Sequence, residues 1–140
     1  MANLSITAAN VIPSTGAIID DITLGEAGTR GQVVYLDTTV IKWYLAINTV
    51  SLNGNNLHTY GIMRILMADG ANNQKVTGCS AGIIFCGATV AVGVRYYLSA
   101  TPGAICPVAD VASGHEAFSI FYGITTSTVQ VQFVDQGTLA

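Results

Sequence analysis

The stretch "GVRYYLSATPGAICP", Gly93 to Pro107, predicts a strand, a tight turn and the beginning of a second strand. Tyr-Tyr-Leu favours extended structure, and Thr-Pro-Gly-Ala is typical of a turn. The stretch "GQVVYLDTTVIKWYL", Gly31 to Leu45, has the same layout 62 positions earlier, and its Gly, Tyr, Leu and Thr recur in register. We therefore expect the chain to form one hairpin twice, with Gly93, Tyr97 and Leu98 as scaffold positions.

The repeat extends beyond the two hairpins. The same shift carries "YGI" at 60–62 onto a second "YGI" at 122–124. Because one constant offset joins two separated motifs, the sequence predicts a weak internal repeat spanning 31–62 and 93–124. Two copies favour a pseudo-symmetric β-fold over a solenoid, which needs at least three repeats.

The rest of the chain consists of short apolar runs separated by turn-forming residues. Fifteen glycines interrupt the segments that could otherwise be helical. The run "TVQVQFV", 128–134, alternates apolar residues with glutamine, which is the period-2 pattern of a half-exposed strand. We expect an all-β fold over 14–140, a small antiparallel β-barrel or β-sandwich that is pseudo-duplicated and forms a single domain.

Residues 1–13 precede the repeated unit and alternate only loosely between apolar and polar positions. Twelve extended residues could reach about 40 Å. Two interpretations remain open for this segment. It is either an extended N-terminal arm that adds a strand to a neighbouring molecule, or the first strand of the same sheet.

The composition is poor in charge and rich in apolar residues. Asp, Glu, Lys and Arg make up 9% of the chain, against about 25% in an ordinary soluble domain, and 51% of residues are hydrophobic. Such a surface is either a neutral Thr/Asn/Ser surface on a monomer or is partly buried against other chains, and we favour the second. The net charge of −3 and the scattered cations leave no basic face for nucleic acid. The most apolar window, 81–94, is too short to span a bilayer.

One motif resembles a catalytic nucleophile. "GCSAG", 78–82, matches the G-x-S-x-G pattern around Ser80. A nucleophile of this type should lie on a strand-to-helix turn, with an acid and then a histidine downstream. The candidates Asp110 and His115 lie only five residues apart, and no helical segment follows Ser80. A small-residue turn between strands explains the motif better, so we expect no enzyme.

The sequence also gives little support for a metal or cofactor site. His58 and His115 lie in separate polar loops, and neither has a closely spaced second ligand. Asp20-Asp21 is the only dipeptide of two carboxylates, and we expect it to end a strand. The cysteines are odd in number and form no CxxC pair, so we expect small buried hydrophobes in a protein made in a reducing cytoplasm. They are Cys79, Cys86 and Cys106.

The aromatic residues divide into two expected groups. Neighbouring residues of a strand face opposite sides, so one member of Tyr96-Tyr97 and of Phe121-Tyr122 can fill the core while the other faces a neighbour. The positions fixed by the repeat are expected in the core: Tyr35, Tyr60, Tyr97 and Tyr122. The others are expected at an interface: Tyr44, Tyr96 and Phe121.

Three stretches of the chain resemble a class of small tailed-bacteriophage proteins described as capsid decoration or cement proteins. They are "MANLSITAANVIPSTGA", "GQVVYLDTT" with its downstream "YGI", and "VGVRYYLSATPGAICPVADVASG". The likeness covers most of the chain and is strongest at "MANLSIT" and "YYLSATPGAICP". Similar "YYLS-TPG" hairpins also occur in phage tail and fibre proteins. The sequence departs from the class at "TYGIMRILMADGANNQ", which is bulkier than the small-residue segment expected there.

This resemblance implies a structural virion protein that has no catalytic site or cofactor. Such a protein is made in the bacterial host cytoplasm, binds the outer surface of an assembled capsid as a homotrimer, and cements neighbouring major capsid subunits. It has no nucleic-acid or membrane partner and no small-molecule substrate. A protein that binds only the expanded lattice stabilises that lattice by linkage. The candidate capsid or protomer contacts are Ala2, Asn3, Leu4, Ser5, Ile6, Thr7, Val11, Ile12, Tyr44, Tyr96 and Phe121.

A second reading is a β-module of a phage tail fibre, spike or baseplate that binds a host-surface glycan. A glycan site needs an exposed aromatic ring beside polar acceptors. The nearest set in the sequence is Trp43 with Asn53, Asn55 and Asn56.

Overall fold

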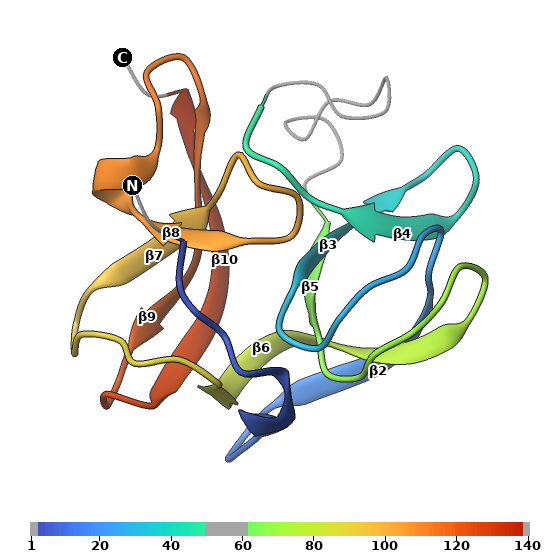
Figure 1. Cartoon of the computed structure of the whole chain (residues 1–140), viewed down its shortest axis with the longest axis horizontal. Helices are drawn as coiled ribbons and strands as arrows, with labels where there is room; N and C mark the ends of the chain where they lie inside the picture. The colour runs from blue at the N-terminus through green and yellow to red at the C-terminus, as the bar shows by residue number, and fades with distance from the viewer. Residues whose placement is uncertain (1–2, 50–61, 139–140) are drawn as a thin grey trace.

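The computed structural model describes residues 3–49 and 62–138. The chain is all-β, and its strands in these ranges form one antiparallel sheet that curls around a common core (Figure 1). The strands are β1 (Val11–Pro13), β2 (Ile18–Thr23), β3 (Val33–Asp37), β4 (Lys42–Leu45), β5 (Met63–Leu66), β6 (Lys75–Cys86), β7 (Arg95–Leu98), β8 (Ile105–Pro107), β9 (Glu116–Gly123) and β10 (Thr128–Thr138). Two short 3-10 helices accompany them, η1 (Ala8–Asn10) and η2 (Val108–Asp110).

The order of strands divides the sheet into two similar halves. The sequence of neighbours is β4-β3-β5-β6 followed by β10-β9-β7-β8, so that β6 and β10 meet in the middle. Figure 1 shows the β2–β5 half on one side and the β7–β10 half on the other, with β6 running between them. The long strand β6 also pairs with β2 along its first part and with β1 at its end.

The two hairpins share one register under the shift of 62 residues. Tyr35 opposes Tyr44 in the first hairpin, and Tyr97 opposes Cys106 in the second. The turns also correspond, because the chain has a positive φ at Ile41 (56°) and at Gly103 (75°). The hairpin of the sequence repeat is therefore repeated in three dimensions.

The same turns are closed by equivalent side chains. The Asp37 carboxylate accepts the backbone N–H of Thr39 at 2.9 Å, and the Ser99 hydroxyl accepts the backbone N–H of Thr101 at 3.1 Å. A short side chain with an oxygen acceptor can close a turn in this way. The two turns thus share the same side-chain-to-backbone hydrogen bond, although its acceptor is aspartate in the first turn and serine in the second.

The shift of 62 does not continue into the strands that follow. In the first half Val34 of β3 opposes Arg64 of β5, and in the second half Tyr96 of β7 opposes Phe121 of β9. Ile62 lies just before β5, whereas Ile124 follows the end of β9. The expected correspondence of the two "YGI" motifs is therefore wrong at this isoleucine, and Tyr60 and Gly61 lie outside the described residues.

Tyr96 and Phe121 are core residues, which corrects the expectation that they face a partner. Their side chains are only 6% and 1% exposed, and their ring centroids are 5.8 Å apart. Tyr97 is buried too, as expected, because the opposite side of β7 is also covered. It packs there in a small cluster with Cys106, Val111 and Ala117. Both neighbours on the strand are therefore buried, although they face opposite sides.

The remaining aromatic side chains follow the expectation in part. Tyr35 is fully buried, as expected, and its ring lies 6.2 Å from that of Tyr44. Tyr44 is only half-buried and lies against the backbone of Gly25. Tyr122 was expected in the core, but it is half-buried on the outer face, with the guanidinium of Arg95 5.2 Å from its ring centroid.

Gly82 lies at the point in β6 where the strand changes partners from β2 to β1 and β10. Its φ of +94° is in the region that favours glycine. A Cβ placed there would lie 2.1 Å from the carbonyl oxygen of Gly16. Glycine therefore allows the chain before β2 to approach β6 closely at this point.

Candidate functional site

The residues of the possible nucleophile motif do not form a catalytic arrangement. Ser80 lies within β6, and its hydroxyl is 3.4 Å from the carbonyl oxygen of Ile18 on β2. The motif is therefore part of a strand, neither the turn between strands that we expected nor a strand-to-helix turn. His115 precedes β9, and its Nδ1 lies 2.8 Å from Oδ1 of the buried Asn48.

The other candidate polar groups are paired, exposed on a strand or outside the described ranges. Asp20 forms an ion pair with Arg64 at 3.2 Å, while Asp21 is exposed on β2. These two residues lie inside β2, so the expectation that they end a strand is wrong. His58 lies outside the described residues. Within the described ranges, no group of three His, Cys, Asp or Glu side chains is placed to hold a metal ion.

Trp43 is not an exposed stacking surface. Its side chain is buried in a cluster with Leu24 and Val34, and the guanidinium of Arg64 lies 5.1 Å from its ring centroid. A sugar ring therefore cannot reach its face, which removes Trp43 from the expected glycan site. Its suggested companions Asn53, Asn55 and Asn56 lie outside the described residues.

The three cysteines are free thiols and are buried, as expected. Burial raises the pKa of the Cys106 thiol from 9.0 to about 11, and the charge of Asp110 acts in the same direction. Burial also raises the pKa of Cys79 and Cys86. Thiols of this kind are poor nucleophiles, because the thiolate is the reactive form.

We expect the folded protein to resist alkylation by iodoacetamide at pH 8. A rise of two pKa units leaves Cys106 with about a hundredfold less thiolate than an ordinary thiol. Mass spectrometry of protein labelled in buffer and in guanidinium chloride would measure this. Rapid labelling of all three thiols in the folded protein would contradict the burial.

The free energy of unfolding should also fall as the pH rises from about 9 to about 11, because the unfolded chain loses a proton from Cys106 there that the folded chain keeps.

The N-terminal segment lies on its own chain. Leu4 donates its backbone N–H to Ile105 of β8 at 2.8 Å, and Thr7 donates its own to Gly87 at 2.8 Å. The segment then forms η1, and β1 pairs antiparallel with β6. The sequence left open whether this segment is an arm that reaches a neighbouring molecule or the first strand of the same sheet. Residues 11–13 form a strand of the same sheet.

Within this segment the candidate contact residues separate by exposure. Leu4 and Ile6 are half-buried and pack on the core, and Val11 is buried in it. Val11 is therefore corrected from a contact residue to a core residue. The residues that face outward are Asn3, Ser5, Thr7 and Ile12, and Ala2 lies outside the described residues.

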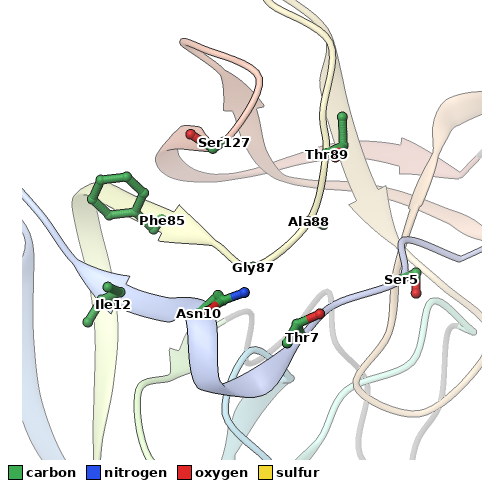
Figure 2. Close-up of a pocket in the computed structure, with 9 residues that line it drawn as sticks. All are labelled: Ser5, Thr7, Asn10, Ile12, Phe85, Gly87, Ala88, Thr89 and Ser127. Atoms are coloured by element: carbon green, nitrogen blue, oxygen red, sulfur yellow. The ribbon is translucent and has the colours of Figure 1, made fainter.

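A pocket of about 520 Å³ opens between the N-terminal segment and the end of β6. Figure 2 shows Ile12 and Phe85 together at one end of it, Asn10 opposite Gly87, and Thr7 and Ser5 toward the other end. The lining contains no charged residue; its members are Ser5, Thr7, Asn10, Ile12, Phe85, Gly87, Ala88, Thr89 and Ser127. The sequence did not predict this pocket, because its walls come from three separate segments, 5–12, 85–89 and Ser127.

A second surface feature is an apolar tip formed by Val92, Val94 and Ile124. These side chains are exposed, and Val92 is 63% exposed. Backbone hydrogen bonds hold the two loops together: Gly93 donates to Gly123 at 2.8 Å, and Gly123 donates to Val94 at 3.1 Å. The loops 87–94 and 123–128 contain no charged residue. The loops lie side by side on the β7–β10 half of the molecule (Figure 1).

Comparison with protein-family models and with curated proteins finds no match for the chain. In the described part of the chain, no helix is long and apolar enough to cross a membrane.

Proposed function

We propose that the protein is a structural virion protein that binds the outer surface of an assembled phage capsid and links neighbouring major capsid subunits. The resemblance of "MANLSIT" and "YYLSATPGAICP" to phage decoration proteins supports this proposal. We further propose that it acts as a homotrimer, is made in the host cytoplasm and needs no catalytic group. Its partners are the major capsid protein and other copies of itself.

The observation that carries the proposal is the apolar tip of Val92, Val94 and Ile124. Isolated exposed hydrophobic residues are ordinary on a protein surface, but an uncharged group of them indicates a contact with another protein. Burying one valine side chain contributes about 1.5–3 kcal/mol. Because many copies act on one shell, modest contacts of this size add up through avidity.

We expect Val92→Asp to lower the affinity for capsids at least tenfold, since it places a charge in the proposed contact and removes about 1.5–3 kcal/mol of apolar burial. Occupancy would be measured by sedimenting capsids assembled without the protein after mixing them with each variant. Val40→Asp is the matched control, because Val40 is 48% exposed and lies in the β3–β4 turn of the other half. Equal occupancy for both variants would overturn the role of the tip.

Deletion of the first thirteen residues is a poorer test. It would remove Val11 from the core and leave the carbonyl oxygen of Ile105 without its hydrogen bond from Leu4. A loss of binding would then report unfolding as readily as a lost contact. Single substitutions on exposed side chains avoid this ambiguity.

A further inference from the structure

We propose that the pocket between the N-terminal segment and the end of β6 binds one or two rings of a neutral saccharide. Its volume of about 520 Å³ lies within the range of about 300–1,000 Å³ that is usual for small-molecule sites. This binding does not depend on the proposed attachment to a capsid, which uses the apolar tip.

The first argument is the apolar surface at one end of the pocket. Ile12 of β1 and Phe85 of β6 are register partners, and both remain exposed, at 49% and 39%. Figure 2 shows their side chains next to each other. A pyranose ring presents a face of C–H groups, which packs against a flat apolar surface such as an aromatic ring. The pair offers such a surface without a charged neighbour in the pocket lining.

The second argument is the supply of uncommitted polar groups around this surface. Asn10, Thr7, Thr89 and Ser127 line the pocket. In the part of the chain that the structure describes, their side chains make no hydrogen bond to another protein group. Hydroxyl and amide groups can both donate and accept hydrogen bonds. They therefore match a ligand that carries many hydroxyl groups.

The third argument is that backbone hydrogen bonds already hold the walls in place. Thr7 donates to Gly87 at 2.8 Å, Asn10 donates to Thr7 at 3.0 Å, and Cys86 donates to Ser127 at 3.2 Å. A Cβ on Gly87 would lie 2.6 Å from the carbonyl oxygen of Thr7, so glycine allows this close approach. A pocket that is formed before binding spends less free energy on ordering its walls.

The absence of charge from the lining decides the class of ligand. Phosphates, carboxylates and cationic ligands are ordinarily held by an opposite charge, and none of the nine lining residues carries one. A purely apolar ligand would cover these four polar side chains without offering them hydrogen-bond partners. A neutral saccharide meets both conditions.

The test is a titration of the ¹⁵N-labelled full-length chain, followed by amide chemical shifts. The probes are maltose, lactose and N,N′-diacetylchitobiose, each raised to about 20 mM, because an open site of this kind should bind with a Kd on the order of 1 mM. We expect at least one disaccharide to shift the amides of Thr7, Phe85 and Gly87. Isopropanol is the control for unspecific contact with the apolar surface. The proposal is overturned if no disaccharide shifts these amides, or if isopropanol shifts them as the disaccharides do.

Two variants locate the binding. Phe85→Ala and Asn10→Ala should each weaken saccharide binding at least fivefold while leaving a dispersed spectrum. Asn72→Ala is the control for the second variant, because Asn72 is an exposed residue in the loop between β5 and β6. Unchanged affinity in both pocket variants would contradict the assignment. Val92→Asp should bind the saccharide as the unmodified chain does, so this proposal and the capsid proposal can fail separately.

Discussion

Phe121→Ala is expected to lower the free energy of unfolding by about 4 kcal/mol, because truncation of a fully buried phenylalanine loses its transfer free energy and leaves a cavity. Phe121 is 1% exposed and packs against Tyr96 in the main core. Urea denaturation followed by far-UV circular dichroism and by tryptophan fluorescence would measure the change. The transition should remain cooperative, with a lower midpoint and a similar slope.

Phe85→Ala is the matched control, because the same atoms are removed from a side chain that is 39% exposed. We expect it to cost about 1 kcal/mol or less, as is usual for a cross-strand pair on an open face. The difference between the two variants separates a core role for Phe121 from the interface role that the sequence favoured. An isolated chain as stable with Phe121→Ala as with Phe85→Ala would favour the interface role.

Gly82→Ala is expected to destabilise the fold by about 4 kcal/mol. A residue with a Cβ is strained at a φ of +94°, which costs about 1–3 kcal/mol. The added carbon would also lie 2.1 Å from the carbonyl oxygen of Gly16 and 2.6 Å from Cα of Ala17. Because both contacts are with backbone, relief requires the chain before β2 to move away from β6. Overpacking of this kind typically costs about 1–3 kcal/mol more.

Gly16→Ala separates the two contributions. Gly16 also has a positive φ, +72°, but a Cβ there would meet nothing within 4 Å. It should therefore cost only about 1 kcal/mol, from backbone strain alone. Thermal unfolding of the two variants side by side would show a much larger fall in Tm for Gly82→Ala. Equal falls would mean that the close approach of Gly16 to β6 contributes little.

The sequence contains enough information to predict the fold class and the two hairpins. The period-2 pattern and the turn residues are local signals, and the constant shift from Tyr35 to Tyr97 reports one register in both copies. The shift fails after the hairpins because β5 and β9 are joined to them by connections of different length. A match of three letters at "YGI" could not reveal this difference.

The exposure of Tyr96 and Phe121 could not be predicted in the same way. Alternation along a strand shows which neighbours face opposite sides, but it does not show whether both sides are covered. The side of Tyr97 is covered by Val111 and Ala117, which come later in the chain and carry no signal of that contact. The burial of both sides of the strand therefore depends on three-dimensional packing, which the alternation of residues along the strand does not show.

The pocket was equally beyond sequence analysis, although one of its residues carries a usable signal. In "IIFCG" Phe85 alternates with Ile84 and Cys86, which are both buried. Period 2 places Phe85 on the opposite face, and a large aromatic side chain on an outer face is a reason to look for a contact there. Most of the polar groups around it come from other segments, which the pairing of β6 with β1 and with β10 brings close.

The position of β6 between the two halves limits how either half could be exchanged with another protein. Among the described residues, β10 pairs with β9 on one side and with β6 on the other, as in the pairing of Val129 with Ile84. Without that neighbour, the edge of β10 would present unpaired backbone groups along a strand of alternating valine and glutamine, which invites association with other chains. The turn of either hairpin can therefore be lengthened or shortened without breaking this pairing. We expect that neither half of the sheet would fold as an independent unit.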